Sequence, residues 1–155
     1  MGRHTMISAI QVAQYLLALA HSKGDQISNL KLQKLLYYLQ GFSLVINNEP
    51  LFREPIEAWA HGPVVVDVYH KYSKYGNNHI PTKEGIRGIL DKDVQEFIDE
   101  VYSEYGRYSA WKLRQMTHME PPWKGAYRVD VSGVVITHKA MIDYFSQFVS
   151  QTTIK

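Results

Sequence analysis

The chain has 155 residues, a formal net charge of +2, 45% hydrophobic and 21% charged residues, and no cysteine. This length and composition predict one soluble globular domain with a sizeable core, and the small net charge does not by itself indicate nucleic-acid binding. The absence of cysteine excludes disulfides, thiolate zinc sites and cysteine nucleophiles, and it fits a cytoplasmic protein. No apolar run approaches the ~20 residues that a membrane-spanning helix needs, and no signal peptide is recognisable.

The N-terminal part of the chain predicts a short leader followed by a helix. Residues 1–5 look like an added leader, Met6 is the expected natural start, and residues 6–155 are expected to form a single domain. Residues 7–23 carry apolar side chains at helical spacing, and Gly24 is a typical helix stop. The recurring apolar residues are Ile10, Ala13, Leu16, Leu17 and Ala20.

A second helix is predicted to begin after Ser28, whose hydroxyl suits an N-cap, and to end at the turn formed by residues 47–50. One stripe of this helix is strongly apolar, which is typical of a helix that packs on a core through one face. We therefore expect Leu35, Leu36, Leu39 and Phe42 to be buried and Lys31 and Lys34 to be exposed on another side. The stripe consists of Leu32, Leu35, Leu36, Leu39, Phe42 and Ile46.

The middle of the chain predicts a strand, a tight turn and a helix. Residues 51–59 are interrupted by Pro55, which favours an irregular or edge strand. Gly62 tolerates a backbone conformation that other residues avoid. Pro63 is expected to be the first residue of a helix that reaches Tyr75, because the first helical position does not need an N–H group.

The remaining segments alternate between helices and loops, with one β-prone run that is expected to pair residues 134–136 with residues 56–59. The sequence thus predicts a mainly α, compact helical domain with one small two-stranded β-sheet. The segments are a mobile loop over 76–88, helices over 91–105 and 110–117, one helical turn over 122–127, a β-prone run over 131–136, and a last helix capped by Thr137.

Seven histidines raise the question of a metal site. The histidines near other candidate ligands are His61, His70 and His118, but no two of them have the i, i+4 spacing of a helical zinc motif. The carboxylates that could join them are Glu57, Asp67 and Glu120. We expect no metal and no other cofactor, because no Gly-rich phosphate loop follows a strand either.

Catalysis has equally little support. Glu57, His61, Asp67 and His118 supply the groups for acid–base chemistry, but no spacing rule unites them, and no serine lies in a Gly-x-Ser-x-Gly elbow. No nucleophile has a recognisable activator. A non-enzyme is therefore the favoured interpretation, and a small histidine-dependent metalloenzyme that uses His61 and His118 is the weaker alternative.

Three motifs occur together in this chain. They are residues 29–41 (NLKLQKLLYYLQG), residues 56–69 (IEAWAHGPVVVDVY) and residues 117–127 (THMEPPWKGAY). In this order they resemble the Panacea domain, the family of SocA-like antitoxins often met in prophages and bacterial defence islands. The resemblance extends over residues 6–148, and the second and third motifs are the specific ones.

The resemblance implies a non-enzymatic antitoxin that neutralises a cognate toxin by direct protein–protein binding. It also implies, for some members, delivery of the toxin to a bacterial protease. We expect the second and third motifs to form two neighbouring corners, each combining a tryptophan with a histidine. The expected partner-binding residues are Trp59, His61, Tyr69, Thr117, His118, Trp123 and Tyr127. The expected structural residues are Gly62, Pro63 and Pro122.

The alternative function is transcriptional autoregulation through DNA. Lys31, Lys34 and Lys71 are the candidate phosphate contacts, although lysines on a helix are more often simply solvated. No additional helix-turn-helix segment is recognisable, which argues against autonomous operator binding. The sequence leaves the toxin, the oligomeric state and the exposure of the motif residues open.

Overall fold

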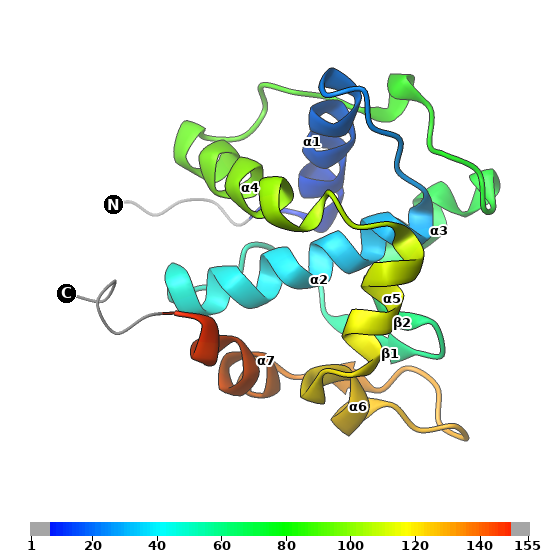
Figure 1. The fold of residues 1–155 in the computed structure, drawn as a ribbon, viewed down its shortest axis with the longest axis vertical. Helices are drawn as coiled ribbons and strands as arrows, with labels where there is room; N and C mark the ends of the chain where they lie inside the picture. Colours follow the sequence, from blue (N-terminus) through cyan, green and yellow to red (C-terminus); the bar gives the residue numbers. More distant parts are fainter. Residues whose placement is uncertain (1–6, 150–155) are drawn as a thin grey trace.

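The computed structural model describes residues 7–149, so the predicted leader and Met6 lie outside the described residues. The fold is mainly α, as predicted (Figure 1). Short 3₁₀ turns at Ser73–Tyr75, Thr82–Glu84 and Ser146–Phe148 join or extend the main elements. The main elements are α1 (Ala9–Ser22), α2 (Asn29–Ile46), β1 (Ile56–Trp59), β2 (Gly62–Val64), α3 (Val66–Tyr72), α4 (Lys92–Tyr105), α5 (Ala110–His118), α6 (Pro121–Ala126), β3 (Val135–Ile136) and α7 (His138–Phe145).

Most helices begin where the sequence predicts. The hydroxyls of Ser28, Ser109 and Thr137 accept backbone N–H groups at the starts of α2, α5 and α7. Such caps satisfy donors that a helix start otherwise leaves free. The local sequence therefore determines these boundaries.

Helix α2 is the central element of the molecule. It packs against α1, α3, α4, α5, α7 and β2, and Figure 1 shows it crossing the middle of the fold between α1 and α4 on one side and α6 and α7 on the other. The helix is therefore buried around most of its circumference and not along a single stripe. At one point α7 lies so close that a Cβ on Gly41 would meet the Phe145 ring at 2.2 Å.

The central position of α2 corrects two predictions about its faces. Lys34 has no exposed surface, and Lys31 is half-buried, with its Nζ donating to the Gly106 carbonyl at 2.7 Å. At the other end of the helix, Phe42 is only half-buried and Ile46 is 52% exposed. The amphipathic pattern assumed that one side of α2 faces solvent, whereas neighbouring helices cover both sides.

The sheet has three strands in the order β2-β1-β3, not two. The predicted pairing of 56–59 with 134–136 is confirmed, with Ile56 opposite Ile136 and the Ala58 N–H donating to the Val134 carbonyl at 2.8 Å. Strand β1 is the central strand, so the edge-strand prediction is wrong. Pro55 lies just before β1 and therefore removes no hydrogen bond from it.

Pro63 does not begin a helix. It lies in β2, opposite Ala58, and forms an antiparallel hairpin with β1 whose turn is Ala60 and His61. The following helix, α3, begins at Val66, with Asp67 in its first turn as expected. Pro63 tolerates this position because β2 is an outer strand of the sheet, where a ladder N–H is dispensable.

The segment 76–88, predicted as a mobile loop, is held to the core at several points. Ile80 is buried and its N–H donates to the Ile27 carbonyl at 2.9 Å, while the Ile86 N–H donates to the Gln14 carbonyl at 3.1 Å. Its relative mobility stays a prediction.

Within residues 7–149, no helix has the length and apolar character needed to cross a membrane.

Candidate functional site

The two predicted corners meet in space. The indole N–H of Trp123, on α6, donates to the main-chain carbonyl of Trp59 in the β1–β2 hairpin at 2.8 Å. A Cβ on Gly62 would lie 3.3 Å from Thr117 Oγ1, which places the end of α5 directly against the hairpin. The closeness of the two motifs is therefore confirmed, although they are separated by more than fifty residues in the sequence.

On the first corner, aromatic rings gather at the hairpin turn. The Trp59 ring lies 5.0 Å from that of Tyr69 on α3 and 5.8 Å from the His61 imidazole, and the His61 and Tyr69 rings stack at 5.9 Å. All three side chains are half-buried. They combine a fixed geometry with remaining solvent contact, which is what a binding anchor requires.

On the second corner, three rings form a continuous stack. Trp123 lies between His118, at 4.1 Å, and Tyr127, at 4.8 Å. The His118 ring also makes a backbone hydrogen bond with Ala60, at the tip of the hairpin. The stack therefore supports the hairpin from the side of α5 and α6.

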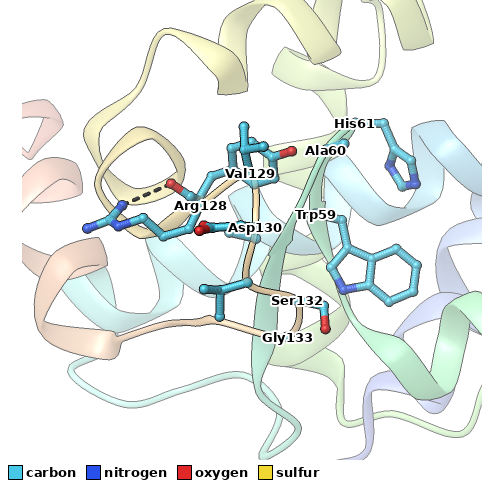
Figure 2. Close-up of a pocket in the computed structure, with 11 residues that line it drawn as sticks. Trp59, Ala60, His61, Arg128, Val129, Asp130, Ser132 and Gly133 are labelled. Carbon is cyan, nitrogen blue, oxygen red and sulfur yellow. Dashed lines mark hydrogen bonds between the residues drawn. The ribbon is translucent and has the colours of Figure 1, made fainter.

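A hollow of about 560 Å³ lies between the hairpin and the loop that follows α6. Its lining includes residues 58–61 on one side and residues 127–133 on the other (Figure 2). Two of the loop's side chains are strongly exposed apolar groups, Val129 at 89% and Val131 at 50%. In Figure 2 the rings of Trp59 and His61 point away from Val129, so the hairpin presents aromatic rings on one side and borders the hollow on the other.

Beneath the hairpin lies a cluster of buried basic groups. A Cβ on Gly62 would be 2.9 Å from Lys34 Nζ, and Gly62 has a φ of +125°, which side chains rarely tolerate. Lys34 Nζ, His61 Nδ1 and His118 Nε2 are buried and have no hydrogen-bond partner. Buried polar atoms without a partner are uncommon in native proteins, so three in one place are a feature to explain.

Burial and mutual repulsion keep this cluster weakly charged. Burial, assisted by the nearby Arg114 guanidinium, lowers the pKa of Lys34 to about 7. Burial also lowers the pKa of His61 and of His118, and the positive charges of Lys34 and Arg114 lower both further. Both imidazoles are therefore neutral at pH 7, and Lys34 is divided between its charged and neutral forms.

A second buried cluster surrounds Glu120, at the junction of α5 and α6. Its carboxylate accepts the hydroxyls of Tyr37 at 2.9 Å and Tyr38 at 2.7 Å, both from α2, and Tyr144 also hydrogen-bonds to it. Burial raises the pKa of Glu120 to about 7 even though these hydroxyls favour the ionised form. This cluster fastens the junction of α5 and α6 to the central helix.

The predicted site residues fall into two groups. Trp59, His61, Tyr69, His118, Trp123 and Tyr127 all keep some exposed surface, whereas Thr117, Gly62, Pro63 and Pro122 are buried. Thr117 directs its hydroxyl to the Arg114 carbonyl at 3.1 Å within the corner, and its predicted contact with a partner stays a prediction.

Sequence reasoning missed Lys34 and Arg114 at this site. The amphipathic pattern predicts an exposed position for Lys34, and no spacing rule connects either residue with the two corners. The available signal was that Lys34 lies within the first of the three co-occurring motifs, among residues that now prove to be buried.

The candidate metal ligands named from the sequence do not form a cluster in the part of the chain that the structure describes. Among residues 7–149 no three His, Asp or Glu side chains are arranged to hold a metal ion. Glu57 accepts the indole N–H of Trp59 at 2.9 Å, so it is engaged in the hairpin itself. The hairpin and the α5–α6 corner together form a rigid aromatic surface above a buried basic cluster.

Comparison with known proteins identifies the family of this chain. The family model described as "Antitoxin SocA-like, Panacea domain" matches residues 32–124. Antitoxin SocA of Caulobacter vibrioides (strain NA1000 / CB15N) is 36% identical over 129 residues, which is 76% of this chain and 69% of the relative. No solved structure matches. The matched span contains both the hairpin and the α5–α6 corner, and the chain belongs to the SocA-like antitoxin family that the Panacea domain defines.

Proposed function

We propose that this protein is the antitoxin of a toxin–antitoxin pair and that it neutralises its cognate toxin by direct binding. The observation that carries the proposal is the β1–β2 hairpin, where Trp59, His61 and Tyr69 form a fixed, half-exposed aromatic group beside a hollow of about 560 Å³. Family membership supplies the biological setting.

The hairpin surface has the composition of a protein-binding site. Interfaces concentrate their binding energy in a few aromatic anchors surrounded by less critical contacts. Trp59 and Tyr69 supply the anchors, and the exposed Val129 and Val131 supply apolar area at the rim. Because Trp123 and Glu120 fix the corner behind it, little ordering entropy is lost when a partner binds.

The experiment is rescue of growth by co-expression with the neighbouring reading frame. Expressed alone, that frame is expected to stop growth, and this protein is expected to restore it. His61→Ala and Tyr69→Ala are expected to abolish rescue while leaving the melting temperature nearly unchanged. The matched control is His138→Ala, because His138 is an exposed histidine at the start of α7.

Two results would count against the proposal. Failure of the wild-type protein to rescue growth from any neighbouring frame would remove the antitoxin assignment. If His61→Ala and Tyr69→Ala both retain full rescue, or lose it only together with their folded state, the toxin surface lies elsewhere on the molecule.

Delivery of the toxin to a protease stays a separate prediction. It is tested by the half-life of the toxin in cells with and without this protein. The DNA-binding alternative loses one of its three candidate contacts with a duplex backbone, because Lys34 has no exposed surface against which a DNA duplex could lie. A gel shift on the upstream DNA, repeated at increasing salt, tests what remains of it.

A further inference from the structure

The buried polar side chains of α2 show a consistent pattern with one exception. Gln33 accepts the Val65 N–H at 2.8 Å, Gln40 accepts the Leu51 N–H at 2.7 Å, and Asn29 donates to the Tyr69 carbonyl at 3.0 Å. Each of these side chains fastens a neighbouring segment to the central helix, and Ser43 does the same for the Glu49 carbonyl. Lys34 is equally buried, yet its Nζ has no partner.

The groups around Lys34 Nζ do not neutralise it. The charged and titratable neighbours that act on it or on the adjacent imidazoles are Arg114 and His118 from α5 and His61 from the hairpin, and all of them are basic. The ion pairs found in residues 7–149 join Arg107 with Glu104 and Lys139 with Asp143, both on the exposed surface. Buried charges in proteins are normally paired, so this basic cluster lacks the opposite charge that would complete it.

We propose that Lys34 Nζ and His61 Nδ1, with the His118 ring beside them, form a receptor for a single oxyanion. The shared chemistry is a carboxylate or phosphate oxygen that accepts hydrogen bonds from the lysine and from the Nδ1–H tautomer of His61. The neutral His118 ring, which bonds to the Ala60 backbone, lies beside the site and is not counted as a donor. Two sources fit this chemistry: an acidic side chain of the bound toxin, or a free inorganic anion. The first source rests on the proposed function, and the second does not.

The route to the receptor passes the hairpin turn. Ala60 is exposed and His61 is half-buried at the turn, whereas Lys34 lies below Gly62. Access to the lysine from this side therefore requires the hairpin turn to move. Because Gly62 has no side chain, only the backbone of the hairpin covers Lys34 at this position.

Binding of an anion is coupled to a proton. An anion beside the amine favours the ammonium form, and the pKa of unliganded Lys34 is about 7. At pH 8, where the free amine predominates, binding therefore takes up a proton, and affinity falls as pH rises. A purely structural lysine would show no such coupling.

The first arm of the test uses free anions. Melting temperatures are measured at pH 6.5 and pH 9 in sodium phosphate, sodium sulfate or sodium acetate, each against sodium chloride at equal ionic strength. A receptor for free anions gives a stabilisation with at least one of the three oxyanions that saturates with concentration and weakens at pH 9. Lys34→Met is expected to abolish it. Lys31→Met is the matched control, because it removes the same charge from the same helix and leaves the receptor intact.

The second arm uses the toxin. Isothermal titration calorimetry of the wild-type protein with the toxin, in two buffers of different ionisation enthalpy at pH 8, reports the proton uptake directly. If a toxin carboxylate occupies the receptor, Lys34→Met loses the proton uptake and weakens binding roughly 30-fold or more, whereas Lys31→Met keeps both.

The outcomes separate the two sources and the two proposals. If Lys34→Met loses the stabilisation by oxyanions and Lys31→Met keeps it, the free-anion source is supported. If Lys34→Met loses both toxin affinity and proton uptake, the carboxylate source is supported. If Lys34→Met and wild type respond alike to all three anions and bind toxin alike, the receptor is overturned while the antitoxin assignment stands. If wild type does not bind toxin at all, the antitoxin assignment fails and the free-anion arm alone decides.

Discussion

Two buried ionisable groups, Lys34 on α2 and Glu120 beside α2, have opposite hydrogen-bonding surroundings. At Glu120, two tyrosine hydroxyls from α2 and one from α7 converge on the carboxylate. At Lys34, one turn earlier on α2, the amine has no hydrogen-bond partner and its neighbours are basic. Burial brings both pKa values to about 7, from opposite directions.

The contrast in hydrogen bonding indicates which of the two clusters stabilises the fold. A buried group whose hydrogen bonds are all made stabilises one arrangement of its surroundings, and here it fixes α5 and α6 against α2. A buried group without partners costs stability, so its presence calls for a use outside the folding of the chain. The Glu120 cluster therefore builds the corner, whereas the Lys34 cluster is the one to which we assign the proposed anion site.

The largest effect is expected from Glu120→Ala. This change leaves the Tyr37 and Tyr38 hydroxyls buried without an acceptor, and each such group costs about 1–3 kcal/mol. We expect the free energy of unfolding to fall by about 2–5 kcal/mol in urea denaturation. Glu100→Ala, on the exposed side of α4, is the control and should change it by less than ~0.5 kcal/mol. Equal effects of the two changes would remove the distinction between scaffold and receptor.

The opposite sign is expected from Lys34→Met. Replacing a buried, unpartnered amine by an apolar chain of similar volume should raise the free energy of unfolding at pH 7 by about 1–4 kcal/mol. A loss of stability instead would mean that the ammonium has a stabilising partner in the folded protein.

The pH dependence of stability checks the same point. The Lys34 pKa is lowered from 10.5 to about 7 on folding. Between these values the unfolded chain binds the extra proton, so this group makes stability rise with pH, by up to about 1.4 kcal/mol per pH unit. The Glu120 pKa is raised from 4.5 to about 7, so the folded chain holds the extra proton there and stability falls as pH rises through that window. Lys34→Met should flatten the first slope and leave the second.

The smallest effect is expected from Trp123→Phe. Phenylalanine keeps a ring between His118 and Tyr127 but removes the N–H that donates to the Trp59 carbonyl. One such hydrogen bond contributes about 1 kcal/mol, so we expect a loss of that size with toxin affinity largely retained. A large loss of affinity at unchanged stability would move Trp123 from the scaffold to the binding surface.

Much of the local structure followed from the sequence alone. Serine and threonine hydroxyls cap helices wherever they occur before an apolar run, because the bond lies within a few residues of chain. The pairing of residues 56–59 with 134–136 also followed, because short β-prone runs in a helical chain have few alternative partners. The two specific motifs pointed to the hairpin and the α5–α6 corner, where the structure does gather the aromatic residues.

What the sequence could not decide was which side of an element would be covered. Pro63 and Gly62 suit a helix start as well as an outer strand, and only the pairing of β2 with β1 selects the strand. Lys34 lies on what looks like the polar side of an amphipathic helix, and it is buried because α5 and β2 pack over that side. Periodicity reports how apolar each face is, whereas burial depends on how many neighbours surround the element. For a central helix such as α2, that number is set by contacts between distant parts of the chain.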